Sequence, residues 1–265
     1  MIDNYLTIIF LLACGFGSGI FVSLSSGTAA SIMIPCFTIL IGYSIHLAIG
    51  TSLVIDCFIG AIAGLVFLKN GNVDMRSGLL LAITGVIGAF IGSRFTSGTP
   101  ASGLGLFVAS LLIITGLTFL IRGIRKNIDY IHGKINLDIF KERKIPFLVI
   151  FGLIIGLASG FSGMGGSRMV AVVLIFILGY DVHKAIGTSL LMMVFIAGAG
   201  VIGHSINNEV IFSSALLAAP AAALGALSGS LVANRVDEDK LGKIVGVIII
   251  ILGMIIIYNT FFSNF

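Results

Sequence analysis

The segment HLAIGTSL at residues 46–53 returns 137 residues later as HKAIGTSL at residues 183–190, with a single mismatch. Other positions align at the same offset without a gap, including Gly15 with Gly152, Gly19 with Gly156, Ser25 with Ser162, Gly88 with Gly225 and Gly92 with Gly229. Chance could match scattered glycines, but not an ungapped block of this kind. We therefore predict that the chain consists of two copies of one unit.

The composition indicates that this unit lies in a membrane. Of 265 residues, 58% are hydrophobic and 10% are charged, whereas soluble domains carry about 25% charged residues. A spanning helix needs about 20 apolar residues. Apolar stretches occur at residues 5–22, 28–43, 46–68, 77–95, 103–121, 146–161, 167–180, 184–203, 210–233 and 244–262. The sequence predicts an all-α polytopic membrane protein with about eight to ten membrane segments, the first of them retained rather than cleaved as a signal peptide.

The charges predict how the chain is divided and oriented. The first repeat covers residues 1–121, a basic loop covers residues 122–145, and the second repeat covers residues 146–265. Because cytoplasmic loops are enriched in Lys and Arg, we place this loop in the cytoplasm and the protein in the cytoplasmic membrane. The net charge of +4 is explained by such loops, so we predict no nucleic-acid partner.

The relative direction of the two repeats depends on their first two apolar stretches. If these stretches cross the membrane once between them, the repeats run parallel; if they enter and return, the repeats are inverted. Inversion places nearly all loop Lys and Arg residues on one side, with Arg94 as the exception. We therefore predict inverted repeats with both termini outside.

The same two stretches are short and separated by Gly and Ser, as LSSGTAAS at residues 24–31 and ASGFSGMGGS at residues 158–167. Short, glycine-interrupted segments in corresponding positions of two halves point to a transporter binding site. The N–H groups at the start of a helix favour anions. Each repeat is thus predicted to contain a glycine-broken short hairpin plus three spanning helices, with an anion site where the two breaks meet.

Two charged residues lie inside apolar stretches, Asp56 and Arg168, and their repeat counterparts are Met193 and Ser31. Burying a charge in a membrane costs several kcal/mol unless it is paired or hydrated. Arg168 is a candidate for binding an anionic substrate, and Asp56 for balancing that charge or for carrying a coupling proton. The structural alternatives are an Asp56–Arg168 ion pair or an Arg168 side chain that reaches the membrane interface.

Hydroxyl and glycine residues around the breaks complete the candidate site. Hydroxyls can donate to substrate oxygens, but they also bond to their own helix or join helices. The predicted substrate-binding residues are Arg168, Ser25, Ser26, Gly27, Thr51, Ser52, Ser162, Gly163, Gly165, Gly166, Ser167, Thr188 and Ser189, and the candidate coupling residue is Asp56.

Metal and disulfide sites are not predicted. Cys14, Cys36 and Cys57 lack paired or ligand spacing, and His46 and His183 head corresponding segments, where capping or interfacial roles are expected. The sequence predicts no metal and no cofactor. Gly88 with Gly92 and Gly225 with Gly229 form G-xxx-G pairs that are expected to pack helices closely.

The motifs resemble those of the sulfite exporter TauE/SafE family of membrane permeases. The resemblance rests on Ala48–Ser52 and Ala185–Ser189 (AIGTS in both), on the glycine-rich run from Gly152 to Gly166, and on the turn KNGNVD at residues 69–74. The first half departs from the family's glycine triplet, reading GTAA at residues 27–30. The resemblance implies passive or ion-coupled movement of small sulfur-containing oxyanions such as sulfite, sulfonates or thiosulfate.

Single features of the sequence also fit two other classes of function. GFSG at residues 160–163 resembles the serine motif of rhomboid proteases, with Ser162 as nucleophile and His204 or His183 as base. Ser162 has an equivalent in Ser25 and the histidines have no special spacing, so we predict that the protein is not an enzyme. A non-transporting membrane assembly subunit is the other alternative, and the sequence leaves homo-oligomerisation open.

Overall fold

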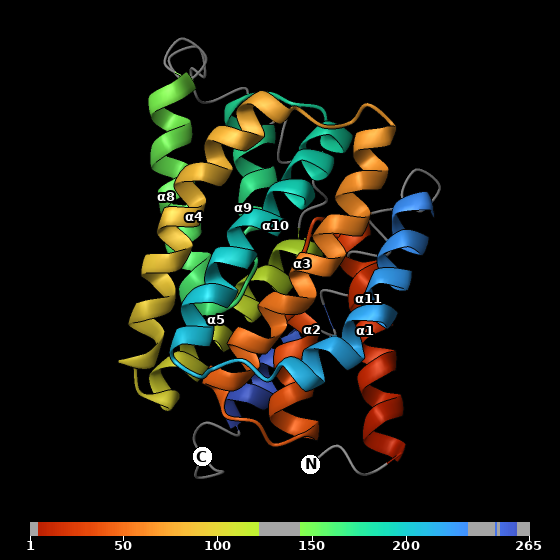
Figure 1. Ribbon diagram of the computed structural model, residues 1–265, viewed down its shortest axis with the longest axis vertical. Coiled ribbons are helices and arrows are strands. Elements are labelled where there is room, and N and C mark those ends of the chain that lie inside the picture. Colours follow the sequence, from red (N-terminus) through yellow and green to blue (C-terminus); the bar gives the residue numbers. More distant parts are fainter. Residues whose placement is uncertain (1–4, 122–143, 233–246, 248–249, 259–265) are drawn as a thin grey trace.

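The computed structural model describes residues 5–121, 144–232, 247 and 250–258, which form helices joined by short connections (Figure 1). The helices of the first half are α1 (Tyr5–Ser25), α2 (Ala30–Pro35) with the π-helical turn η1 (Cys36–Leu40), α3 (Ile45–Lys69), α4 (Met75–Ser97) and α5 (Ala101–Ile121). Those of the second half are α8 (Lys144–Ser162), α9 (Ser167–Val172) with the π-helical turn η2 (Val173–Ile177), α10 (Val182–Ile206) and α11 (Phe212–Val232). The all-α fold class is confirmed for the described residues.

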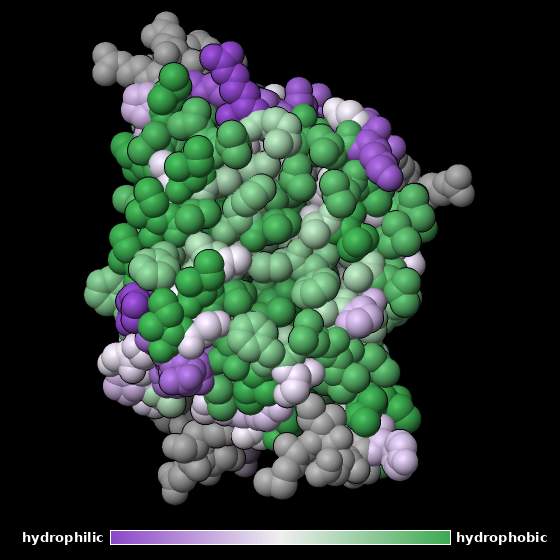
Figure 2. All heavy atoms as spheres, in the orientation of Figure 1, coloured by the Kyte–Doolittle hydropathy of each residue, from purple (hydrophilic) through white to green (hydrophobic). Residues whose placement is uncertain are grey.

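Six of these helices are long and apolar enough to cross a membrane: α1, α3, α4, α8, α10 and α11. Large hydrophobic side chains on them face outward, for example Ile83 and Ile87 on α4 and Leu216 and Leu224 on α11. On the face seen in Figure 2, hydrophobic residues form a broad band, and hydrophilic residues gather near its upper and lower ends. A water-soluble protein would bury such side chains, so the chain is a multi-pass integral membrane protein.

The helices of the two halves pair reciprocally. α1 packs beside α11 and α8 packs beside α4, so the helix that opens each half lies against the helix that follows the AIGTS helix of the other half. α3 packs against α10 between these two pairs (Figure 1). Gly60 of α3 contacts Leu190, and Gly187 of α10 contacts Phe67, so α3 and α10 run antiparallel. The two helices that carry the AIGTS blocks therefore point in opposite directions.

Glycines set the close packing of the outer pairs. A Cβ atom on Gly88 or Gly92 of α4 would collide with a backbone carbonyl of α8, at Leu153 and Leu157 respectively. The corresponding glycines of α11, Gly225 and Gly229, meet the backbone of α1 in the same way. The packing role predicted for both G-xxx-G pairs is confirmed, because only a residue without a side chain lets two helix backbones approach so closely.

Both predicted breaks are present, but the hairpins differ from the expectation. α1 and α8 have 21 and 19 residues, long enough to span, so only the second member of each pair is short. α1 extends to Ser25, whose hydroxyl bonds to the Phe21 carbonyl of the same helix. Gly160, expected to help break the chain, lies within α8 and packs on Ala89. The basic loop predicted at residues 122–145 lies mostly outside the described residues, since α8 begins at Lys144.

Candidate functional site

The two breaks contact each other in the interior of the bundle. The Ser167 hydroxyl, at the start of α9, donates to the carbonyl of Ser26 at 3.2 Å and to that of Gly27. Ser26 has a left-handed backbone, with φ 51°, and its hydroxyl lies 2.7 Å from that of Ser189 on α10. Three of the predicted site residues, Ser26, Ser167 and Ser189, are thus brought together from three parts of the chain.

Asp56 of α3 lies fully buried beside both breaks. Its carboxylate accepts a hydrogen bond from the Thr28 hydroxyl at 2.6 Å and one from the Ala29 N–H at 2.7 Å. A Cβ atom on Gly165, in the second break, would lie 2.6 Å from Asp56 Oδ2. The carboxylate therefore occupies the N-terminus of α2, a position that favours negative charge.

Arg168 lies in the first turn of α9, and its guanidinium reaches the first break. Its Cζ atom is 5.7 Å from the centroid of the Phe21 ring on α1. A Cβ atom on Gly27 would lie 2.9 Å from Arg168 Nη2, so glycine at this position leaves space for the side chain. The structure thus places a cation and a carboxylate at the junction of the two breaks, each on a different half.

Glycine geometry shapes the second break. Gly163 and Gly166 have left-handed backbones, with φ 74° and 77°, a conformation that glycine adopts at little cost. Gly163 also lies against Ile49 of α3, where a side chain would collide. These two glycines turn the chain from the end of α8 into α9.

Three other predicted hydroxyls bond to their own helices. Ser25 donates to the Phe21 carbonyl at 2.6 Å, Ser52 to the Ile49 carbonyl at 2.8 Å, and Ser162 to the Ala158 carbonyl at 2.7 Å. These contacts are the local helix bonds that serine commonly makes. In this conformation the three hydroxyls belong to the helix backbones.

Thr51 and Thr188 lie at a different place, where each AIGTS block meets a loop of the other half. Thr51 Oγ1 accepts a hydrogen bond from the Ile211 N–H at 3.0 Å, and Thr188 Oγ1 accepts one from the Asp74 N–H at 2.9 Å. The glycines that precede them, Gly50 and Gly187, sit under the carbonyls of Glu209 and Asn72 respectively. Each block therefore joins the two halves. The sequence signal for this role was that Asp74 follows Thr51 at the same distance as Ile211 follows Thr188.

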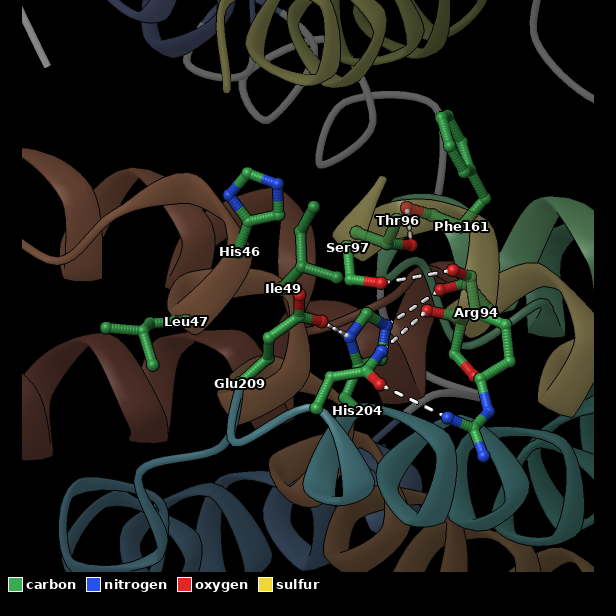
Figure 3. A network of polar contacts seen from close by, with 12 residues as sticks. His46, Leu47, Ile49, Arg94, Thr96, Ser97, Phe161, His204 and Glu209 are labelled. Atoms are coloured by element: carbon green, nitrogen blue, oxygen red, sulfur yellow. Dashed lines mark hydrogen bonds and ion pairs between the residues drawn. The ribbon is translucent and has the colours of Figure 1, made fainter. Parts of the chain in front are cut away.

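A buried polar network that sequence reasoning did not identify lies at the C-terminal end of α10 (Figure 3). His204 Nδ1 is 2.7 Å from Glu209 Oε2, and His204 Nε2 is 2.8 Å from the Gly160 carbonyl. Both side chains are buried. Nearby, His46 contacts the Thr99 carbonyl at 3.0 Å. The available signal was a glutamate in an otherwise neutral turn, NNEVI at residues 207–211.

These contacts bear on the protease alternative. A serine nucleophile needs its base within hydrogen-bond reach, but the Ser162 hydroxyl donates to the Ala158 carbonyl of its own helix. Both ring nitrogens of His204 face other partners, Glu209 and Gly160. Within the part of the chain that the structure describes, no group of three His, Cys, Asp or Glu side chains is placed to hold a metal ion.

Known proteins resemble the chain over most of its length. The profile of the family described as Sulfite exporter TauE/SafE matches residues 11–256. The chain is 24% identical over 240 residues to the probable membrane transporter protein YdhB of Bacillus subtilis (strain 168), which covers 91% of this chain and 96% of that protein. It is 28% identical over 222 residues to a probable membrane transporter protein of Xylella fastidiosa (strain Temecula1), covering 82% of each. No solved structure matches the chain.

Proposed function

The chain belongs to the sulfite exporter TauE/SafE family of membrane transporters, and on that premise we propose that it is a permease for small sulfur-containing oxyanions. The observation that carries the proposal is the junction of the two interrupted helices, where the buried guanidinium of Arg168 and the buried carboxylate of Asp56 both lie against the first break. Buried charges inside membrane segments mark substrate or ion pathways. A transporter family does not favour the protease or the assembly subunit.

Arg168 supplies the positive charge for the anion in this proposal. Its planar guanidinium offers paired N–H donors, which match the oxygens of a sulfonate or sulfite group. Ser26, Ser167 and Ser189 lie at the same junction, and their hydroxyls can exchange their present partners for substrate oxygens. Gly27 keeps the space beside the guanidinium open.

Asp56 takes the first of the two roles that the sequence allowed, as the counter-charge of Arg168. Its carboxylate accepts two hydrogen bonds from the first break, which hold it at the junction that Arg168 also reaches. In the empty site, Asp56 thereby offsets the buried positive charge. The incoming anion then competes with Asp56 for the attraction of the Arg168 positive charge and of the N–H groups at the helix ends.

Transport proceeds by alternating access of two inverted repeats in the cytoplasmic membrane. The reciprocal helix pairs and the antiparallel run of α3 and α10 support this proposal, because inverted repeats that rock around a shared site are a common transporter design. An inside-negative potential favours anion exit by about 2.3 kcal/mol per charge per 100 mV. Export on this basis needs no ATP, whereas uptake requires a coupled ion.

The direct test is anion flux in proteoliposomes that contain the purified protein. Sulfite, sulfate, thiosulfate, sulfoacetate and taurine are offered in turn, and binding is followed in parallel by thermal shift. We expect at least one sulfur oxyanion to be moved and Arg168→Ala to abolish both its flux and its binding. Arg76→Ala, which removes an exposed arginine near the start of α4, is the matched control and should leave both unchanged. If no anion moves, the transport proposal fails; if Arg168→Ala binds as the parent does, Arg168 is not in the site.

A further inference from the structure

The end of α10 and the loop after it carry a buried imidazole–carboxylate pair, His204 and Glu209 (Figure 3). The pair joins the last turn of a membrane helix to a loop of the same half, with His204 Nδ1 2.7 Å from Glu209 Oε2. Neither side chain is needed for the anion site described above. A buried titratable pair in a membrane protein points to a functional role.

The hydrogen bonds determine how many protons the pair holds. The Gly160 carbonyl can only accept, so His204 Nε2 must carry a proton. Nδ1 faces Glu209 Oε2 at 2.7 Å, and this contact also needs a proton on one of the two atoms. The pair is therefore either an imidazolium with a carboxylate or a neutral imidazole with a carboxylic acid. In both forms it holds one proton more than a neutral imidazole and a free carboxylate.

The loop between α3 and α4 shows that the fold does not require this pair. The Asn72 N–H donates to the Phe67 carbonyl at 2.9 Å, just as the Glu209 N–H donates to the His204 carbonyl at 2.9 Å. Phe67 and Asn72 stand 137 residues before His204 and Glu209. The same backbone turn is thus closed once by neutral side chains and once by a pair that binds a proton.

The pair is connected to the second break of the anion site. Gly160 lies near the end of α8. The Met164 N–H, four residues further on, bonds to the Ser162 hydroxyl. The Gly160 carbonyl receives its hydrogen bond from His204 instead. Thr96 of α4 donates to the next carbonyl, that of Phe161, at 3.2 Å. On its other side, Glu209 packs its own carbonyl over Gly50 of α3. A change in the pair therefore acts on the end of α8, three residues before Gly163.

Two further charged or titratable side chains lie around the pair (Figure 3). Arg94 of α4 donates to Asn207 Oδ1 at 3.3 Å, and His46 of α3 contacts the Thr99 carbonyl. α8 presents Gly160 and Phe161 here. Arg94 bonds to Asn207 of the turn. The positive charge nearest to the Glu209 carboxylate is therefore the proton that lies between Glu209 and His204.

We propose that His204 and Glu209 form the proton-binding site that couples anion movement to a proton gradient. When the proton leaves to water, the Nδ1 lone pair faces a carboxylate, and either the contact with Glu209 or that with Gly160 must open. Opening releases the end of α8 and with it the second break. The coupling role rests on the transport function proposed above, whereas the proton site itself does not.

The matched variant is the double substitution His204→Phe with Glu209→Asn. It places at these two positions the residues found at the corresponding positions 67 and 72 of the α3–α4 loop. Parent and variant are compared in proteoliposomes with sulfoacetate and with thiosulfate, at clamped membrane potential, with and without a pH gradient. If one proton moves with each anion, one pH unit should drive about tenfold accumulation in the alkaline compartment of parent vesicles. The double variant should still equilibrate the anion but lose this accumulation. Accumulation by the double variant equal to that of the parent overturns the proposal.

Glu209→Gln is a second variant that keeps the hydrogen bonds. The new amide can donate to Nδ1 while Nε2 still donates to Gly160, so the protonated arrangement is preserved without a proton to release. We expect it to fold as the parent does and to lose the pH-driven accumulation. If the parent itself transports without any response to the pH gradient, the inference is wrong while the proposed function stands.

Thermal unfolding in detergent tests the proton site without transport. Melting curves are recorded between pH 7.5 and 9. The contact between His204 Nδ1 and Glu209 Oε2 needs a proton, so loss of that proton as pH rises should lower the stability of the parent. Relative to the double variant, the parent should lose melting temperature across this range. Parallel melting curves overturn the proton site even if no anion moves and the proposed function has already failed.

Discussion

The carboxylate of Asp56 lies where the sequence alone would place a substrate anion, at the N-terminus of α2. It accepts hydrogen bonds from Thr28 and Ala29 and lies against Gly165. Position 193, which corresponds to Asp56 in the second half, is a methionine. The two halves therefore differ in charge at the site, with the acid on the first half and the base, Arg168, on the second.

Asp56→Asn removes the negative charge, while its amide oxygen can still accept from the Ala29 N–H and its NH2 group can donate to the Thr28 hydroxyl oxygen. We expect the variant to fold and to bind the transported anion more tightly, by about tenfold, because the counter-charge of Arg168 is lost. The dissociation constant is measured by calorimetry in detergent. The response of flux to a pH gradient should persist; its loss would make Asp56 the coupling residue in place of the His204–Glu209 pair.

Asp74, outside the spans, stabilises the start of α4. Burial raises the pKa of this carboxyl, but hydrogen bonds from Tyr180, Ser77 and the N–H groups of Ser77 and Arg76 outweigh it and lower the pKa to about 2. A lowered carboxyl pKa stabilises the fold above the ordinary value near 4 and loses this contribution as pH falls towards 2. The melting temperature should therefore drop between pH 4 and pH 2. Asp74→Asn should flatten that drop, and equal slopes for both proteins would contradict the assignment.

At the scale of helices, close backbone contact holds the bundle together. α1 packs against α11 through Gly15 and Gly19, and α8 packs against α4 through Gly152 and Gly156. The sequence predicted the G-xxx-G pairs on α4 and α11, but their partner surfaces on α1 and α8 are also rich in glycine. Both surfaces of each contact lack side chains, which explains much of the excess of glycine.

Gly19→Ala tests this packing. The added Cβ would collide with the backbone of α11 at Ala222 and Ala226, and overpacking of this kind costs typically 1–3 kcal/mol, or ~5 °C or more in melting temperature. Gly17→Ala, two residues away, is the control because nothing lies within 4 Å of its Cβ position. Alanine there should leave stability unchanged or raise it by about 0.5–1 kcal/mol. A neutral Gly19→Ala would show that the two helices are not in close contact.

At the scale of the molecule, each AIGTS block joins one half to a loop of the other. Thr51 Oγ1 accepts a hydrogen bond from the Ile211 N–H, and Thr188 Oγ1 accepts one from the Asp74 N–H. These loops follow helices that run antiparallel, α10 and α3, so they lie at opposite ends of the bundle (Figure 1). The proposed inverted topology requires them to face opposite sides of the membrane.

Cysteine labelling checks that topology. In a chain whose Cys14, Cys36 and Cys57 are replaced by serine, single cysteines are introduced as Asn70→Cys and Asn208→Cys, both in exposed positions. A membrane-impermeant thiol reagent added to intact cells should label position 208 and reach position 70 only after permeabilisation, because the basic loops are expected inside. Labelling of both positions from one side would rule out inverted repeats.

Sequence alone was sufficient for the features that local composition and periodicity encode. The apolar stretches predicted the helices to within a few residues, the glycine and serine runs located both breaks, and Asp56 and Arg168 stood out because charge is costly in an apolar segment. The repeated AIGTS block predicted two related halves, which stays a prediction, and both blocks make the same kind of contact with a loop of the other half. These properties depend on neighbouring residues, so they are visible in the chain itself.

Only the tertiary structure showed which of these residues meet. Ser26 contacts Ser189, Asp56 caps α2, and His204 bridges Glu209 to the end of α8. The threonines of the AIGTS blocks, which the sequence placed in the anion site, bond to loops of the opposite half. Each of these contacts except the His204–Glu209 pair joins residues far apart in the chain. Those between the two halves require that glycine-lined helices from opposite halves pack closely enough to align them.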